Sequence, residues 1–365
     1  MSVLKGSGAG VANNIKERAT RPGVGAPGGL EGEIMYFYCE KCKKQYALNS
    51  HSYMCECGGM FRLYKEPGEE VPHDITLGEH ETPLLPLQVG KLEFLLKMES
   101  MQPTGSFKDR GAAAMINELH ALGVKKIALD SAGNAGAAIA GYAAAAGMEC
   151  HVYVPDDIST EKISQIEAYG ADIVQVANGR MKACAAVKQN LGDAYYASHV
   201  YNPLFTEGVK SMAHELYHQL GGHVPDYVFV PVGNGTLLIG LYLGFMEIGR
   251  LPHFVAVQSS KCAPVYEAFH KLEPQPKKTT IASALRIEKP KRLNDILYAL
   301  ETSRGDAIVV EDKDILKAKK YLGAHGIYVE MSSAAVLAGA AQFFKDGKPD
   351  NYRVVLPITA TGLKR

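Results

Sequence analysis

Short apolar runs rich in β-branched residues alternate with longer Ala- and Leu-rich stretches from about residue 75 onward. The short runs are typical of buried strands, and the longer stretches, several of which end in glycine, are typical of helices. The predicted strands are 127–130, 150–155, 172–176, 227–232, 253–258, 307–311 and 352–357, and the clearest helices are 135–147 and 332–347. This alternation predicts an α/β fold with mainly parallel sheets and helices on both faces.

The chain of 365 residues is long enough for two such domains around a shared cleft. We expect an N-terminal α/β domain at 75–200 and a C-terminal one at 201–365. Residues 1–34 have glycine-rich, unpatterned sequence, which predicts a flexible tail. Met35 opens the patterned sequence and is a candidate for the native start.

Composition narrows the classes of function. Lys plus Arg and Asp plus Glu number 39 each, so no strong charge favours nucleic acid or an anionic membrane. No apolar run approaches the roughly 20 residues of a membrane span, and the start lacks a secretory pattern. Cys150, Cys184 and Cys262 are scattered singly, which indicates reduced thiols. We therefore expect a cytoplasmic protein.

Four further cysteines form a cluster within residues 35–65. Cys39 and Cys42 make a CxxC pair, and Cys55 and Cys57 make a tighter CxC pair followed by two glycines. Two such pairs on short turns can converge on one tetrahedral zinc ion. With all four ligands from the protein, the Zn²⁺ would be structural. The alternative is a ribbon that holds no metal.

Two loops between a predicted strand and a predicted helix have the small residues that anion binding needs. Such residues allow successive backbone N–H groups to point at one anion, and the helix N-terminus adds a favourable field. Glycine-rich turns of this kind also occur merely because they permit close packing. The first loop is Ser131, Ala132, Gly133 and Asn134, and the second is Gly233, Asn234, Gly235 and Thr236. Two such loops in one chain suggest a ligand with two anionic ends.

Lys108 lies in the segment PTGSFKDRG, directly before a predicted helix. The helix macrodipole disfavours a cation at this end, so the pKa of the amine should be lowered. A neutral amine is suited to nucleophilic or Schiff-base chemistry. For an isolated lysine, an exposed side chain without a special role would be the simpler interpretation.

Six segments together resemble the threonine synthase family within the fold-type-II pyridoxal-phosphate (PLP) enzymes. PTGSFKDRG resembles the family's NPTGSFKDRG, and VPVGNGTLLIG resembles its phosphate loop. LGEHETPLL, SAGNAGAA, IYVEMSSAAVLAG and LPITATGLK resemble further family segments in the same order. Some threonine synthases also have an N-terminal ribbon. The resemblance implies a two-domain, fold-type-II PLP enzyme, and a homodimer.

The resemblance also implies roles for individual residues. Lys108 would hold PLP as a Schiff base and later act as the base for the α-proton. Asn134 would bind the cofactor's 3-hydroxyl, and Thr359 would face its ring nitrogen as a neutral partner. Residues 233–236 would bind the cofactor phosphate. The substrate would contact the loop 131–133, and we also assign Thr104 and Arg110 to it.

Threonine synthases convert O-phosphohomoserine and water to threonine and phosphate, so the resemblance implies a lyase of threonine biosynthesis. Three places depart from the family: Phe205 stands where an arginine is usual, Thr361 replaces a histidine, and residues 179–183 lose two carboxylates and gain two cations. Loss of an arginine removes a bidentate phosphate contact. Arg110, Lys182 and Lys210 are candidates to replace it.

These departures leave alternatives open. One is β-elimination or β-replacement on serine, threonine or O-phosphoserine, as in dehydratases and cysteate synthases. Another is a PLP-binding homologue without turnover, although the intact PTGSFKDRG segment argues against it.

Overall fold

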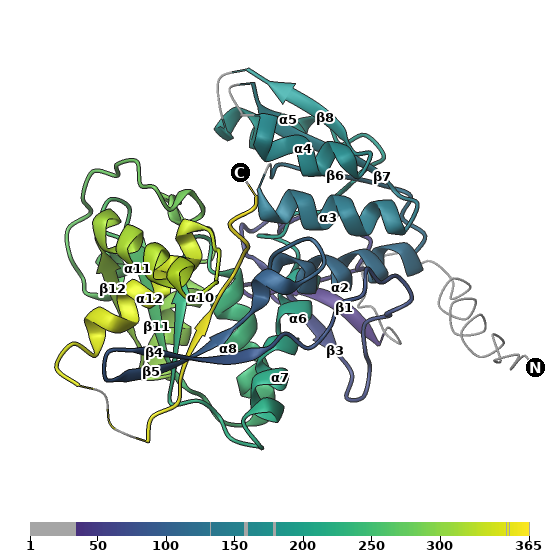
Figure 1. The fold of residues 1–365 in the computed structure, drawn as a ribbon. Coiled ribbons are helices and arrows are strands. Elements are labelled where there is room, and N and C mark those ends of the chain that lie inside the picture. The colour runs from purple at the N-terminus through teal and green to yellow at the C-terminus, as the bar shows by residue number, and fades with distance from the viewer. Residues whose placement is uncertain are drawn as a thin grey trace, which may run out of the picture.

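The computed structural model describes residues 34–131, 133–156, 160–177, 180–347, 349 and 351–364. Of the expected tail, residues 1–33 lie outside this part. The described chain forms three β-sheets with helices packed around two of them (Figure 1). No helix within the described ranges is both long and apolar enough to cross a membrane.

Six strands form the larger sheet, in the spatial order β12-β11-β10-β13-β5-β4, with every neighbouring pair parallel except β4 and β5. The strands are β4 (Leu84–Val89), β5 (Leu92–Lys97), β10 (Tyr227–Pro231), β11 (His253–Ser259), β12 (Asp306–Val310) and β13 (Val354–Pro357). Side chains alternate between two cores, because Val228 and Val230 belong to one hydrophobic cluster and Phe229 to the other. Both faces of the sheet are therefore buried, which explains the uninterrupted apolar runs.

Four parallel strands form the smaller sheet, in the order β8-β7-β6-β9. They are β6 (Lys126–Leu129), β7 (Glu149–Pro155), β8 (Asp172–Val176) and β9 (Tyr195–Tyr196). Ile127 and Leu129 belong to the main hydrophobic cluster, whereas Ala128 belongs to a third, smaller one on the other face of this sheet. This sheet is also apolar on both faces.

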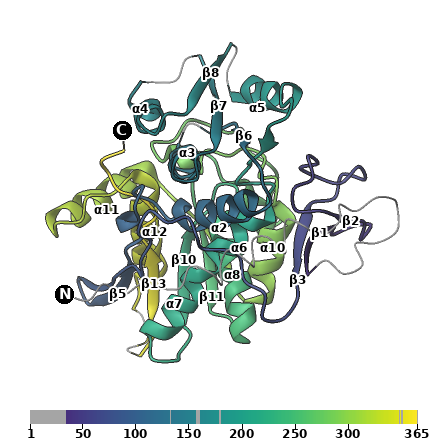
Figure 2. The ribbon, with the colours of Figure 1, turned by 90° about the vertical axis from the view of Figure 1, so that its right-hand side faces the viewer.

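The remaining sheet is antiparallel and lies to one side of the molecule (Figure 2). Its order is β2-β1-β3, with β1 (Met35–Cys39), β2 (Gln45–Tyr46) and β3 (Phe61–Lys65). Arg62 joins it to the rest of the chain through an ion pair with Asp295. We call residues 34–65 the ribbon.

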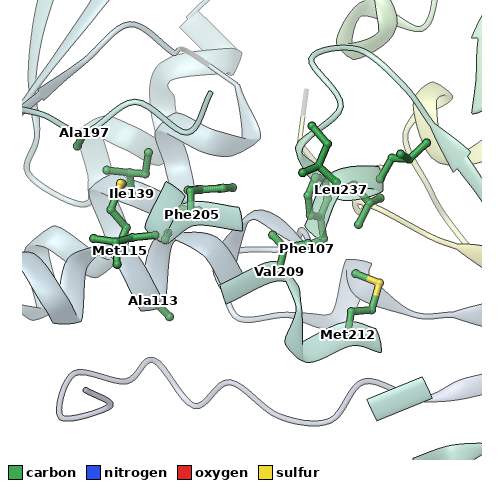
Figure 3. Packing of buried hydrophobic residues seen from close by; sticks show 14 of the residues in the cluster. Phe107, Ala113, Met115, Ile139, Ala197, Phe205, Val209, Met212 and Leu237 are labelled. Atoms are coloured by element: carbon green, nitrogen blue, oxygen red, sulfur yellow. The ribbon is translucent and has the colours of Figure 1, made fainter. Parts of the chain in front are cut away.

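The helices pack against the two parallel sheets and against one another. In chain order they are η1 (Glu99–Met101), α2 (Lys108–Ala121), α3 (Asn134–Ala145), α4 (Thr160–Ala168), α5 (Arg180–Gln189), α6 (Pro203–Val209), α7 (Ser211–Gln219), α8 (Thr236–Ile248), α9 (Pro264–Phe269), η2 (Ser283–Leu285), α10 (Leu293–Thr302), α11 (Asp312–Ala324) and α12 (Met331–Phe343). Figure 3 shows Phe205 and Val209 of α6 among the buried residues of α2 and α8. A Cβ on Gly208 would lie 2.0 Å from the carbonyl oxygen of Arg110, so this close helix contact requires glycine.

The α/β architecture predicted from the pattern is confirmed, and all seven predicted strands are present within two residues of their expected bounds. One segment differs from the expected organisation. β4 and β5 fall within 75–200 but pair with β13 in the larger sheet. β5 is held there because Leu96 and Phe94 complete the core beneath α12. The smaller sheet is built entirely from residues within 126–196.

Candidate active site

Lys108 is the first residue of α2, as the PTGS turn before it predicted. Its Nζ donates a hydrogen bond to the hydroxyl of Thr236, the first residue of α8, at 3.2 Å. The amine also lies 4.5 Å from the ring centroid of Phe107 and 5.6 Å from that of Phe205. Its surroundings are therefore mostly apolar.

Burial lowers the pKa of Lys108 to about 7, and the negative charge of Glu330 acts in the opposite direction. An ammonium group loses hydration in apolar surroundings, so the neutral amine is favoured. The lowered pKa matches the expectation from the sequence, but desolvation is its main cause, not the helix macrodipole. Near pH 7 a large fraction of this amine is neutral and able to act as a nucleophile or base.

The loop Gly233–Thr236 connects the end of β10 to the start of α8 and forms a tight cradle. Gly235 has φ +86°, a left-handed conformation that favours glycine, and a Cβ there would lie 2.5 Å from the side chain of Ile296. A Cβ on Gly233 would lie 2.5 Å from the carbonyl oxygen of Ala284. The loop can therefore present backbone N–H groups and the helix N-terminus to an anion only with glycine at both positions.

A carboxylate joins two of the residues that we expected to contact the cofactor. The side-chain amide of Asn134 donates to Glu330 at 3.1 Å, and the hydroxyl of Thr359 donates to the other oxygen of the same carboxylate at 3.5 Å. Ser333 exchanges a hydrogen bond with Thr359 at 2.9 Å. Residues from both parallel-sheet regions thus meet at one point near Lys108.

Glu330 is the functional residue that the sequence reasoning missed. Burial raises the pKa of its carboxyl, while Asn134 and two lysines counteract the shift. The signal was the segment IYVEMSSAAVLAG, where a glutamate directly precedes a serine-rich helix. This segment contributed to the family resemblance, but no role was assigned to its glutamate.

The first anion-binding loop lies between β6 and α3. Gly133 is the N-cap of α3, and Asn134 is its first residue. A Cβ on Gly136 would lie 1.8 Å from the carbonyl oxygen of Ser131, so the loop folds tightly over the helix start. Ala132 lies outside the described residues. The loop has the strand-to-helix position expected of a carboxylate-binding element.

Arg110 and Thr104 are engaged in structural contacts. Arg110 is buried and donates to both oxygens of Glu99 and both oxygens of Glu215, at 2.6 to 2.8 Å, and to the hydroxyl of Ser211. These contacts use all five guanidinium N–H groups, so the substrate role expected for Arg110 is replaced by a structural one. The amide and hydroxyl of Thr104 both donate to Asp109, which holds the PTGS turn.

The four ribbon cysteines come together as the spacing predicted. Their ligand atoms lie within 4.8 Å of one another, with Sγ–Sγ distances of 3.4 Å for Cys39–Cys57 and for Cys42–Cys55. Tetrahedral zinc with bonds of about 2.3 Å places sulfur atoms roughly 3.8 Å apart, so the cluster is close to that size. A Cβ on Gly59 would lie 2.3 Å from the Sγ of Cys39, which explains the glycine.

The residues present fit PLP. Lys108 supplies a partly buried amine with a lowered pKa, the 233–236 cradle suits a phosphate group, and Thr359 offers a buried neutral hydroxyl. Residues 75–360 match the family described as pyridoxal-phosphate dependent enzyme. The chain is 33% identical to threonine synthase of Methanocaldococcus jannaschii, with 89% of this chain and 92% of that protein covered. It therefore belongs to the threonine synthase family of PLP-dependent enzymes. PLP is its cofactor, and the chain is a PLP-dependent lyase.

Other relatives and solved structures agree with this membership. Threonine synthase of Synechocystis is 33% identical over 85% of this chain and 84% of that protein. Maize serine racemase superposes with a TM-score of 0.68 at 23% identity, covering 78% of this chain and 88% of that one. A fungal L-serine ammonia-lyase from Rhizomucor miehei gives 0.67 at 22% identity, covering 77% and 94%. At these identities the two structures establish the shared fold alone.

Proposed function

We propose that this enzyme converts O-phosphohomoserine and water to threonine and phosphate. The main support for the proposal is that the chain matches proteins named threonine synthase over most of their length. The cluster of polar groups around Lys108 adds to it. That cluster contains an amine that is about half neutral near pH 7, a tight glycine-rich cradle and a polar network that joins Asn134 to Thr359. The substrate class is a small amino acid with a distal phosphate.

The chain's own groups have distinct tasks in this reaction. Bound PLP supplies an electron sink for the substrate's α-carbon. The amine of Lys108, whose pKa is lowered to about 7, takes and returns protons at the reacting carbons, and Thr236 orients it by accepting its hydrogen bond. Thr359 offers a neutral hydroxyl to the cofactor ring. Backbone N–H groups at the start of α3, beside Ser131, orient the substrate carboxylate.

A side-by-side assay tests the reaction. The purified, PLP-loaded protein is incubated with O-phosphohomoserine, O-phosphoserine, serine and threonine, and released phosphate, ammonia and threonine are measured. We expect threonine and phosphate from O-phosphohomoserine, with the largest kcat/KM of the four substrates. Turnover confined to the three-carbon substrates or threonine would favour a dehydratase-like enzyme instead. Release of neither phosphate nor ammonia would indicate a PLP-binding homologue without turnover.

We further propose that the ribbon holds one structural Zn²⁺ on Cys39, Cys42, Cys55 and Cys57. The four sulfur atoms lie within 4.8 Å of one another, and this convergence supports the site. The enzyme is proposed to be a cytoplasmic homodimer that binds no nucleic acid. Sedimentation of the purified protein measures the oligomeric state.

A further inference from the structure

A phosphorylated substrate needs a cation at its distal end, and Phe205, at the position where the family resemblance implies an arginine, does not supply one. The side chain of Phe205 is fully buried in α6. A Cβ on Gly111 of α2 would lie 2.4 Å from its ring, so the two helices enclose the phenyl group. Phe205 therefore belongs to the core, and the positive charge must come from elsewhere.

The three cations considered from the sequence do not supply it. Arg110 has all its donors engaged by carboxylates and a serine. Lys210 is buried and paired with Glu207 at 2.6 Å and with Glu247 at 2.5 Å. Lys182 is an exposed side chain on α5.

Lys364 has the properties that the other cations lack. Its Nζ is buried and has no hydrogen-bond partner in the described part of the chain. Its Cε would lie 3.3 Å from a Cβ on Gly105, which places the side chain beside the PTGS turn that leads into Lys108. The hydroxyl of Ser106, next along this turn, is likewise buried without a partner among the described residues. Two unpaired polar groups therefore lie on adjoining segments.

The backbone fixes Lys364 in this position. The amide of Thr361 donates to the carbonyl of Gly105 at 3.0 Å, and the amide of Phe107 donates to the carbonyl of Thr359 at 3.0 Å. An antiparallel bridge joins Ser106 to Ala360 between them. Figure 1 shows the segment after β13 leaving the larger sheet and ending close to α3. The C-terminal segment thus holds Lys364 beside the turn that leads into Lys108.

The nearby carboxylates attract Lys364 but are engaged elsewhere. Asp109 and Glu330 both act electrostatically on its amine, while burial lowers its pKa to about 8. Asp109 accepts hydrogen bonds from Thr104, and Glu330 accepts one from Asn134. Burying an ammonium group without a hydrogen bond costs free energy, so we expect a bound ligand to supply an acceptor for this amine.

We propose that Lys364, together with the hydroxyl of Ser106 on the adjoining turn, binds the distal phosphate of the amino-acid substrate. The inference rests on the proposed function, because it assumes a phosphorylated substrate. Lys364 would then be the residue that selects phosphorylated amino acids over neutral ones of the same length. It would replace the arginine contact that is lost at Phe205.

A pair of ligands isolates the phosphate contact. An unreactive phosphonate analogue of O-phosphohomoserine and norvaline, which has the same carbon chain without phosphonate, are titrated into PLP-loaded protein. Binding is read from the visible absorption spectrum. We expect Lys364→Met to weaken the phosphonate ligand by about 10- to 100-fold, the loss of one charge-assisted hydrogen bond. Its affinity for norvaline should change less than about twofold.

Control variants define the outcome. Lys182→Met removes an exposed lysine and should leave both affinities unchanged, whereas Lys364→Arg should restore part of the phosphonate affinity. Equal loss of both ligands, or no loss of the phosphonate, would overturn the subsite. The proposed function is judged separately, by threonine formation in the wild-type protein. If the wild-type enzyme forms threonine but Lys364→Met binds the phosphonate as well as wild type does, only the subsite is refuted. If the wild-type enzyme forms no threonine but Lys364→Met selectively loses affinity for the phosphonate, only the proposed reaction is refuted.

Discussion

The side-chain amide of Asn134 donates a hydrogen bond to the carboxylate of Glu330 at 3.1 Å, although 196 residues separate them in sequence. Asn134 begins α3 beside the smaller sheet, and Glu330 is the N-cap of α12 beside the larger one. The same carboxylate raises the pKa of Lys108 against the effect of burial. Glu330 therefore links the two parts of the fold and partly offsets the effect of burial on the pKa of Lys108.

Glu330→Gln should shift the pH dependence of PLP uptake. The neutral amine of Lys108 attacks the cofactor aldehyde, so uptake by the PLP-free protein should rise with pH, with a midpoint of about 7. Removal of the neighbouring negative charge destabilises the ammonium form and lowers the pKa of Lys108, so the midpoint moves to lower pH. Stopped-flow absorbance at a series of pH values measures it. Glu301→Gln, at an exposed position on α10, is the control, and a midpoint that stays or rises in Glu330→Gln would contradict this role.

Gly235→Ala should weaken PLP binding by about tenfold or more, since a non-glycine residue in the left-handed region costs about 1–2 kcal/mol. The added Cβ would also meet Ile296 at 2.5 Å and displace the loop. Gly323→Ala on α11 is a matched control, because a Cβ there meets no atom within 4 Å. Titration of the PLP-free variants with PLP gives both dissociation constants. Equal affinities in the two variants would show that the cradle is not needed.

Arg110→Met should lower the free energy of unfolding, with little direct effect on substrate binding. The substitution leaves Glu99 and Glu215 without their guanidinium partner, and breaking a buried ion pair in this way costs about 3–5 kcal/mol. Denaturant unfolding of the variant should show that loss, whereas Arg250→Met, an exposed change, should not. If the variant instead has a raised KM and an unchanged free energy of unfolding, Arg110 contacts the substrate and the structural role is wrong.

Metal analysis should find about one zinc ion per chain, and Cys42→Ser should remove it. Loss of the ion frees the ribbon, so the Tm should fall by several degrees, whereas the visible absorption of the PLP-loaded protein should persist. Cys184→Ser, at a single half-buried cysteine of α5, should retain the metal. Metal-free protein with an unchanged Tm after gentle purification would reject the zinc site.

Local patterns predicted seven strands of the two larger sheets, because a strand buried on both faces is a continuous apolar run. β5 and the two-residue β9 also pair in parallel but were not among the predicted strands. β4 was missed because it is an edge strand that contains Pro86 and has only one buried side chain. Lys108 and the two glycine-rich loops were visible as short motifs. The partners of Arg110 and Glu330 were not, since Glu215 and Asn134 lie more than a hundred residues from them and only the fold brings them together.

The covalent position of PLP tests the central claim most directly. The PLP-loaded protein is reduced with borohydride, which makes the link between cofactor and lysine permanent, and is then digested and mapped by mass spectrometry. We expect the phosphopyridoxyl group on Lys108, and no labelled peptide and no visible absorption band in Lys108→Ala. A label on another lysine, such as Lys364, or an unchanged band in the variant would contradict the assignment of Lys108.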